Sequence, residues 1–209
     1  MIFMKIYRMK HEHAYKTKYA WSDGYCPLES MPFLDDLAQD HRVSMFGFWS
    51  VNPGPPGMTI YQGGSQWPDC MGIGLGWPHD VFSDRVAYDI QATDIEIWRK
   101  TLMPIADINS KRLQKKSPPL YYVLEAERGI DVDYEASGVP LDSNGKPDHR
   151  ARDKDKKGPL AVKLDSWNGK DLFSTRQGVP MVVYCTEKVK SLAEEKGWTN
   201  VKFEEIPVT

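Results

Sequence analysis

The chain has 209 residues, of which 41% are hydrophobic and 27% are charged. These values are close to the average of globular proteins, so they exclude a disordered chain and a long coiled coil, and the length favours one domain over two small ones. Lys and Arg total 27 against 29 Asp and Glu, a net charge of −2. Because no overall basic field attracts nucleic acid, we expect no direct nucleic-acid binding.

Cysteine usage and hydropathy bear on the compartment. Cys26, Cys70 and Cys185 lie far apart and form no C-x-x-C pair, so neither a disulfide framework nor a zinc finger is indicated. The apolar run at the N-terminus is too short for a signal peptide, and no stretch approaches the roughly 18 apolar residues of a membrane helix. We therefore expect a cytoplasmic protein with reduced thiols, no cofactor and no membrane partner.

The first half of the chain predicts mainly short strands. Met4 and Ile6 share one face of the first strand, and Tyr7 lies on the other face. Proline at position 32 favours the first turn of a short helix. Glycines interrupt the segment 63–76, which predicts irregular structure around one strand. The predicted strands cover residues 2–9, 43–51 and about 71–75, and the helix covers 32–39.

Two further helices have clear start signals. Ser83 is placed to cap a helix that runs to about Gln91, and Thr186 is placed to cap a second one. Gly197 follows the second helix as a left-handed C-terminal residue, and Lys196 lies in its last turn. Each helix has one apolar stripe, formed by Val86, Ala87 and Ile90 in the first and by Val189, Leu192 and Ala193 in the second.

The second half of the chain is rich in β-forming residues. Strands are predicted over residues 120–126, 130–134, 160–164, 181–185 and 201–206. The polar segment 138–158 predicts an exposed hairpin or mobile loop, because strands that need partners lie on both sides of it. Strands outnumber helices without regular alternation, so we predict a single-domain α+β fold with mostly antiparallel strands and two or three short helices.

Metal and phosphate sites have weak signals. His11 and His13 would share one face of a strand, as a metal clip requires, but lysines surround them and no third ligand is marked by its spacing. Glycines at positions 72, 74 and 76 are followed by Trp77, whereas a dinucleotide loop needs a further glycine and a helix there. We predict no metal site and a structural role for these glycines.

Nucleophilic catalysis also has little support, since no G-x-S-x-G elbow occurs and Cys185 ends an apolar run, as a buried small hydrophobic residue would. Paired carboxylates leave a hydrolase as an alternative function. Such pairs act as general acid and base when they project from one face of a strand; the candidate pairs are Glu125 with Glu127 and Asp131 with Asp133.

Aromatic residues point instead to protein binding. The chain has seven tryptophans, and Trp49, Trp67 and Trp77 lie in or beside segments rich in glycine and proline. Aromatic side chains on such loops are typical anchors of protein interfaces. Asp35 and Asp36 supply acidic charge for a basic partner surface. With Asp69, two residues after Trp67, these residues form the predicted partner-binding set.

From about residue 67 onward, the order of motifs resembles the myxobacterial-type immunity domain of bacterial polymorphic-toxin systems. The similarity covers about two thirds of the chain, and the first 60 residues match poorly. The motifs are Trp67-Pro68-Asp69, Phe82-Ser83-Asp84-Arg85-Val86, Met103-Pro104-Ile105, Tyr121-Tyr122-Val123-Leu124, Asp133-Tyr134-Glu135-Ala136-Ser137, Val182-Val183-Tyr184-Cys185-Thr186-Glu187 and Gly197-Trp198-Thr199-Asn200-Val201-Lys202-Phe203.

The resemblance implies a cytoplasmic protein that binds a cognate protein toxin and neutralises it without catalysis. It supplies no catalytic residues, and it leaves the toxin and the oligomeric state unidentified. Two alternatives remain open: a hydrolase that uses the strand carboxylates, and a phage or assembly component that buries its aromatic loops against other subunits.

Overall fold

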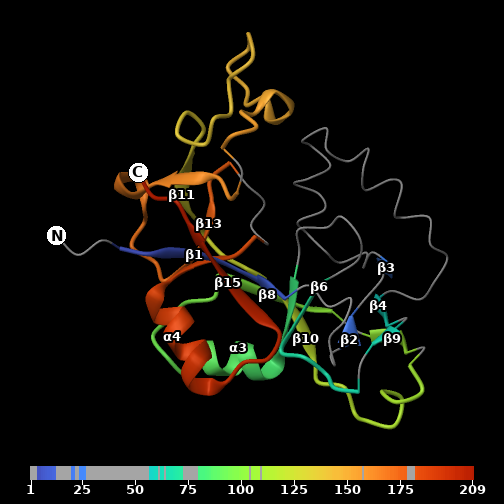
Figure 1. Cartoon of the computed structure of the whole chain (residues 1–209). Helices are drawn as coiled ribbons and strands as arrows, with labels where there is room; N and C mark the ends of the chain where they lie inside the picture. Colours follow the sequence, from blue (N-terminus) through green and yellow to red (C-terminus); the bar gives the residue numbers. More distant parts are fainter. Residues whose placement is uncertain are drawn as a thin grey trace.

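Two larger β-sheets and two α-helices make up most of the described structure (Figure 1). The computed structural model describes residues 4–12, 20–21, 24–26, 57–60, 62–63, 65–72, 80–103, 105–108, 110–156, 158–177 and 182–209. The predicted helix over 32–39 and the predicted strand over 43–51 lie outside these residues.

The six-stranded sheet joins the two ends of the chain, because β1 lies between β14 and β15 and is antiparallel to both. β11 and β13 form the parallel pair of this sheet, and its other neighbours are antiparallel. In spatial order its strands are β12 (Ala161–Lys163), β11 (Arg128–Asp133), β13 (Leu172–Thr175), β14 (Tyr184–Thr186), β1 (Ile6–His11) and β15 (Val201–Ile206).

The four-stranded sheet is antiparallel throughout. In spatial order its strands are β6 (Cys70–Gly72), β7 (Asp80–Ser83), β10 (Tyr121–Glu125) and β8 (Arg99–Met103). Two small sheets accompany it. One pairs β2 (Ala20–Trp21) with β5 (Gln62–Gly63), and the other contains β3 (Gly24–Cys26), β4 (Gly57–Ile60) and β9 (Ile105–Ile108).

Helix α3 (Asp84–Gln91) confirms the first predicted helix and its cap. The Ser83 hydroxyl accepts a hydrogen bond from the backbone N–H of Val86 at 3.4 Å, which satisfies one of the amide groups left open at a helix start. The predicted stripe is buried as expected, and it packs α3 on β7 and β10.

Helix α4 (Glu187–Lys196) confirms the second predicted helix. Gly197 follows with φ of 62°, the left-handed conformation expected of it. Thr186 stands at the capping position, but its side chain makes no capping bond. Its hydroxyl donates instead to Asp171 Oδ1 at 2.6 Å, so it ties the helix start to the segment before β13.

One hydrophobic core joins both sheets and both helices. It combines Tyr7 and Met9 of β1 with Phe82 of β7 and with the buried stripes of α3 and α4. A smaller cluster on the other face of the six-stranded sheet contains Ile6, with Met4 packed against it. The predicted division of Met4 and Ile6 from Tyr7 is therefore confirmed.

The predicted α+β class with mostly antiparallel strands agrees with this architecture. All five strands predicted in the second half are present within a few residues, and the strand near residue 71 is β6. The strands β2, β3, β4, β5, β7, β8, β9 and β13 were not predicted. The segment 138–158 connects β11 to its antiparallel partner β12 and is mostly exposed, as expected. Two short 3₁₀ helices, His149–Ala151 and Leu164–Ser166, complete the described elements.

Candidate functional site

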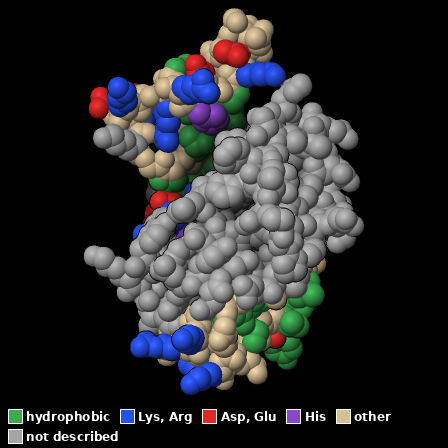
Figure 2. All heavy atoms as spheres, turned by 90° about the vertical axis from the view of Figure 1, so that its right-hand side faces the viewer, with side chains coloured by type: hydrophobic (Ala, Val, Ile, Leu, Met, Phe, Trp, Pro, Cys, Tyr) green, Lys and Arg blue, Asp and Glu red, His purple; other side chains and the backbone are tan. Residues whose placement is uncertain are grey.

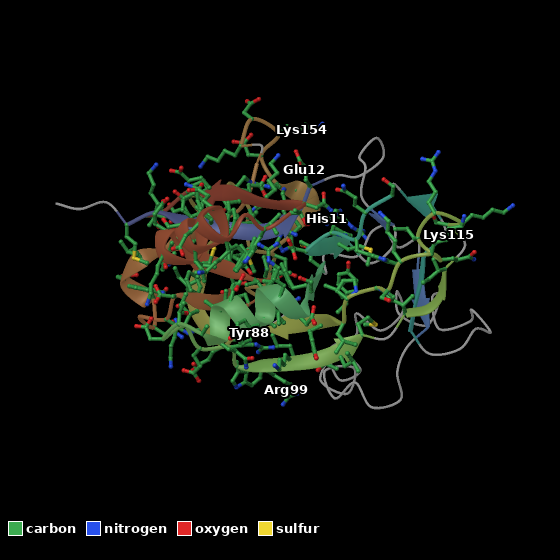
Figure 3. All side chains as sticks on the ribbon, turned by 90° about the horizontal axis from the view of Figure 1, so that it is seen from below. His11, Glu12, Tyr88, Arg99, Lys115 and Lys154 are labelled. Atoms are coloured by element: carbon green, nitrogen blue, oxygen red, sulfur yellow. The ribbon has the colours of Figure 1, made fainter. Side chains whose placement is uncertain are left out.

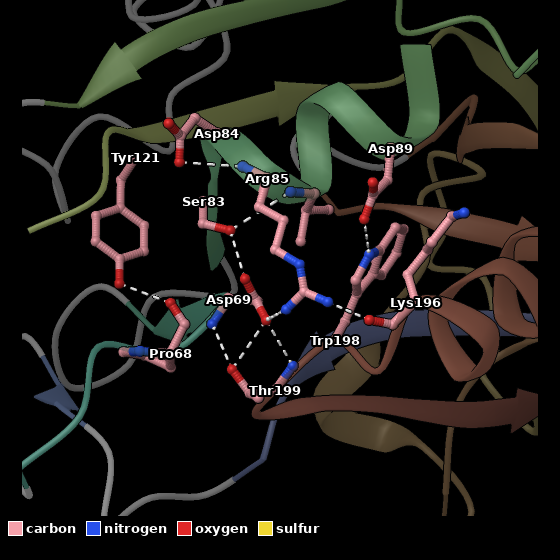
Figure 4. A network of polar contacts seen from close by, with 11 residues as sticks. Pro68, Asp69, Ser83, Asp84, Arg85, Asp89, Tyr121, Lys196, Trp198 and Thr199 are labelled. Atoms are coloured by element: carbon pink, nitrogen blue, oxygen red, sulfur yellow. Dashed lines mark hydrogen bonds and ion pairs between the residues drawn. The ribbon is translucent and has the colours of Figure 1, made fainter. Parts of the chain in front are cut away.

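The predicted binding residue Asp69 lies in an internal polar cluster (Figure 4). It is 7% exposed. Its Oδ1 accepts a hydrogen bond from the Ser83 hydroxyl at 2.8 Å. Its Oδ2 accepts from the backbone N–H of Thr199 at 2.8 Å and forms an ion pair with Arg85 at 3.0 Å. The Thr199 hydroxyl also donates to Oδ2, at 3.0 Å. The Asp69 carboxylate therefore makes four polar contacts with neighbours inside the fold.

The cluster extends to the ends of both helices. Arg85 donates a second hydrogen bond to the carbonyl of Lys196, in the last turn of α4. The indole N–H of Trp198 donates to Asp89 of α3 at 2.7 Å. Asp69 and its partners thus join the segment before β6, the start of α3, the end of α4 and the segment before β15. This arrangement stabilises the fold and leaves Asp69 little surface for a partner.

Trp67 is half-buried and lies against the segment before β10. Its indole N–H donates to the carbonyl of Lys116 at 3.3 Å, and the Lys116 ammonium donates to the carbonyl of Ser65. The next residue, Pro68, accepts a hydrogen bond from the Tyr121 hydroxyl at 2.7 Å. Burial raises the pKa of Tyr121 well above its ordinary value, so this donor stays protonated. The structure therefore brings Trp67 next to a basic segment of the chain.

The other predicted binding residues, Trp49, Trp77, Asp35 and Asp36, lie outside the described residues. Their assignment as partner contacts stays a prediction.

The two carboxylates of the first pair, Glu125 and Glu127, lie in different environments. Glu125 is 1% exposed at the end of β10, and its Oε2 lies 3.9 Å from the guanidinium of Arg99. Glu127 follows the strand and is exposed. The two carboxylates therefore do not share one strand face as the hydrolase alternative requires.

The second pair lies on β11, with each carboxylate engaged locally. Asp131 forms an ion pair with Arg176 at 2.9 Å and accepts a hydrogen bond from Gln177. Asp133 accepts from the backbone N–H of Ala136 at 2.8 Å and from the Thr209 hydroxyl. The bond from Ala136 is the main cause that lowers the pKa of Asp133, so this carboxyl stays ionised, whereas a general acid needs a raised pKa.

His11 contacts another part of the fold. Its Nδ1 lies 2.5 Å from Asp80 Oδ1, and its ring covers Gly72 so closely that an added Cβ would lie 2.5 Å from ring atoms. Gly72 therefore allows this close approach, in keeping with the predicted structural role. His13 lies outside the described residues. Among the residues that are described, no group of three potential ligands is placed to hold a metal ion.

Two cysteines are buried in the core. Cys70 and Cys185 are both 0% exposed and are free thiols. Burial raises the pKa of each thiol above its ordinary value, so neither is a ready nucleophile. For Cys185 this confirms the expected role of a small buried hydrophobic residue.

An exposed apolar surface lies where α3 borders β8 and β10. Tyr88 of α3 is 72% exposed, Leu120 is 53% exposed and Leu102 of β8 is 46% exposed. Leu102 pairs directly with Tyr122 of β10. An open groove of about 440 Å³ lies beside Tyr88, and Lys100, Leu120 and Tyr122 line its other side. Figure 2 shows hydrophobic side chains gathered low on the molecule, at the height of α3 and the lower part of β10 in Figure 1.

Charged side chains of both signs line this groove, namely Asp84, Arg85 and Lys100, and Arg99 is the neighbour of Lys100 on β8. The Lys100 ammonium lies 5.3 Å from the centre of the Tyr122 ring and donates to the amide oxygen of Gln91 at 2.9 Å. The guanidinium of Arg99 lies 5.2 Å from the ring centre of Trp98, which is 50% exposed. Aromatic rings and cations in such contact are common where proteins bind one another.

The sequence contains local signals for two parts of this surface. In the predicted helix, Tyr88 lies on the face opposite Val86 and Ile90, so a helical wheel places it in solvent. Leu120 and Tyr122 are two residues apart in the predicted strand and so share one of its faces, where Leu120 is exposed and Tyr122 is half-buried. The position of β8, which was not predicted, is what brings Leu102 to the same place.

Comparison of the chain with protein-family models and with curated protein sequences finds no match. None of the described helices has the length and apolar content needed to cross a membrane.

Proposed function

We propose that this protein binds a cognate bacterial toxin and neutralises it without catalysis, as an immunity protein does. The exposed apolar surface of Tyr88, Leu102 and Leu120 is the observation that carries the proposal. Large exposed side chains that gather on one face commonly mark a protein-binding site. The motif order from residue 67 onward, which resembles an immunity domain, supports a toxin as the partner.

The surroundings of the candidate carboxylates support binding over hydrolysis. Glu125 faces Arg99, and Asp131 faces Arg176. A general acid needs a raised pKa, whereas the backbone hydrogen bond from Ala136 lowers the pKa of Asp133. A protein that neutralises by occluding an active site needs none of this chemistry, only a rigid surface that fits the toxin.

Co-expression tests the proposal. The toxin encoded by the reading frame beside this gene is induced in cells that carry this protein or an empty vector, and growth is followed. We expect growth only with the protein present, and we expect folded Glu125→Gln to protect as well as the wild type. Loss of protection in a folded Glu125→Gln, or turnover of a substrate by the purified protein alone, would favour the hydrolase.

A further inference from the structure

We infer that two copies of this protein associate through the open edge of β15, which pairs antiparallel with the same edge of the second copy. The pairing is two-fold symmetric, with Phe203 of each copy at the symmetry axis, and it joins the two six-stranded sheets into one. The inference goes beyond the proposed function and is independent of it, because it concerns the protein without its toxin.

The backbone hydrogen bonds of β15 leave one edge of this strand open. β15 lies at the end of the sheet, next to β1, and the N–H of Glu12 donates to the carbonyl of Asn200 at 3.1 Å. Because alternate residues of an antiparallel strand bond to the same neighbour, the even-numbered residues of β15 bond to β1 and the odd-numbered ones face away from it. Among the described residues none bonds to the backbone of these outward-facing positions, which are Val201, Phe203 and Glu205.

The open edge is limited at both ends. Before it, the carbonyl of Thr199 accepts hydrogen bonds from two N–H groups at the start of β6. After it, the carbonyl of Pro207 accepts a hydrogen bond from β12. The open edge is therefore the segment 201–205, and Figure 1 shows β15, in red, on the near side of the six-stranded sheet. A second copy has an open edge of the same length.

Backbone geometry favours one antiparallel register between the two copies. Residues whose N–H and C=O groups point outward must lie opposite one another, so an odd-numbered residue faces an odd-numbered one. When Phe203 faces Phe203 of the second copy, Val201 faces Glu205 of that copy and all the outward-facing residues are paired. A shift of two residues leaves one of these pairs unformed.

The charged residues of β15 select the same register. With Phe203 at the axis, Lys202 lies directly opposite Glu204 of the second copy, and symmetry repeats this contact. A shift of two residues places either Lys202 or Glu204 opposite its own counterpart. Like charges directly opposite each other destabilise a pair of strands, whereas opposite charges stabilise it.

Lys202 has no counter-charge within its own chain. It is exposed and forms no ion pair with a described carboxylate. Its direct neighbour across β1 is Lys10, which takes the carboxylate of Glu204 at 2.8 Å. Glu12, the other carboxylate on this face of β1, makes no ion pair with Lys202. The Glu204 side chain remains 31% exposed, so Lys202 of the second copy can reach it.

Analytical ultracentrifugation of the purified full-length protein over a concentration series tests the inference. Lys202→Glu and Glu204→Lys each place like charges opposite one another in the dimer. In an equimolar mixture of these two variants, opposite charges face each other again at every such position. Glu205→Pro removes an outward N–H without removing a bond to β1.

Lys115→Glu is the matched charge control. Lys115 is exposed, and Figure 3 shows it well away from His11, which pairs with Val201 at the start of β15. Circular dichroism checks that each variant is folded.

We expect the wild type to form a weak dimer whose population rises with concentration, because so short an interface is small. Lys202→Glu or Glu204→Lys alone should weaken the dimer by about tenfold, since each turns attractive contacts into repulsive ones. The mixture of the two should regain the wild-type association, Glu205→Pro should lose it, and Lys115→Glu should keep it.

A wild-type protein that stays monomeric at every concentration would overturn the inference, whether or not the variants fold, and would leave the proposed function standing. A dimer that persists in both charge variants and in Glu205→Pro forms through another surface, which would also overturn it. Failure of the mixture to associate, when each variant alone is folded and monomeric, would contradict the register.

Discussion

Asp69 shows how one buried carboxylate positions several elements. Its two oxygens accept hydrogen bonds from Ser83 and Thr199 and pair with Arg85. These donors come from the start of α3 and from the segment between α4 and β15. A neutral amide in place of the carboxylate cannot accept all these bonds, and it brings N–H groups toward donors.

We therefore predict that Asp69→Asn lowers the free energy of unfolding by about 3 kcal/mol, because hydrogen bonds to a buried charged group are lost. Urea denaturation followed by tryptophan fluorescence measures the change. Asp165→Asn, which makes the same chemical change at an exposed site, should leave stability within about 0.5 kcal/mol. If Asp69→Asn is as stable as the wild type, the contacts of Asp69 do not stabilise the fold, and the earlier prediction that Asp69 contacts a partner would be favoured.

The buried thiols give a second prediction at this scale. Burial raises the pKa of Cys70 and Cys185 above the ordinary value of 9.0, so both stay protonated in the folded protein while the unfolded chain ionises. We expect stability to be unaffected by these thiols below pH 9 and to fall as the pH rises above it. In a Cys26→Ser background, Ellman's reagent should react rapidly only after unfolding, and rapid reaction of the native protein would contradict the burial.

At the scale of the element, both helices could be predicted because their signals are local. Ser83, the apolar stripe and Gly197 act within a turn or two of chain. β7, β8 and β13 could not, since each is short and takes its strand conformation from neighbours distant in sequence. β8 begins with the exposed residues Arg99 and Lys100, and only pairing with β10 identifies it as a strand.

In the candidate site too, some residues are placed by local sequence signals and others by strand pairing between distant segments. Tyr88 is placed by a helix that the sequence predicts, so its exposure could have been anticipated. Leu102 reaches Tyr122 only through the pairing of β8 with β10, which no local pattern indicates. Asp69 was predicted as a partner contact from its motif, and its internal partners Ser83 and Thr199 lie 14 and 130 residues away.

Gly197 offers a test of how α4 ends. Its φ is 62°, and a Cβ added there would meet no atom within 4 Å. The cost of alanine is therefore one of backbone conformation alone. We predict that Gly197→Ala lowers the free energy of unfolding by about 1 kcal/mol and that Gly197→Asn costs less, because asparagine tolerates this conformation. Thermal or urea unfolding compares the two, and equal losses would show that the left-handed geometry is not what matters.

At the scale of the whole molecule, the exposed 138–158 segment separates strands that remain paired. β11 precedes it and β12 follows it, and the two are antiparallel neighbours. β1, from the N-terminal part, pairs with β14 and β15 from the C-terminal part. Cutting the segment therefore leaves two pieces that share a sheet.

We predict that limited proteolysis cuts first within 138–158 and that the two fragments elute together in size-exclusion chromatography under native conditions. They should separate in denaturant. Fragments that part without denaturant and keep their own folded structure would show two independent domains in place of one cooperative unit.

The position of β1 also determines when the six-stranded sheet can form during synthesis of the chain. Ile6 pairs with Ile206 and with Thr186, so the first strand emerges from the ribosome long before either partner exists. Tyr7 and Met9 can pack on Phe82 and on α3 earlier, but β1 lacks the strands on both of its edges until nearly the whole chain has been translated. Closing so long a loop is slow, and during that interval the nascent chain depends on the four-stranded sheet and α3, whose partners are much closer in sequence, for its early structure.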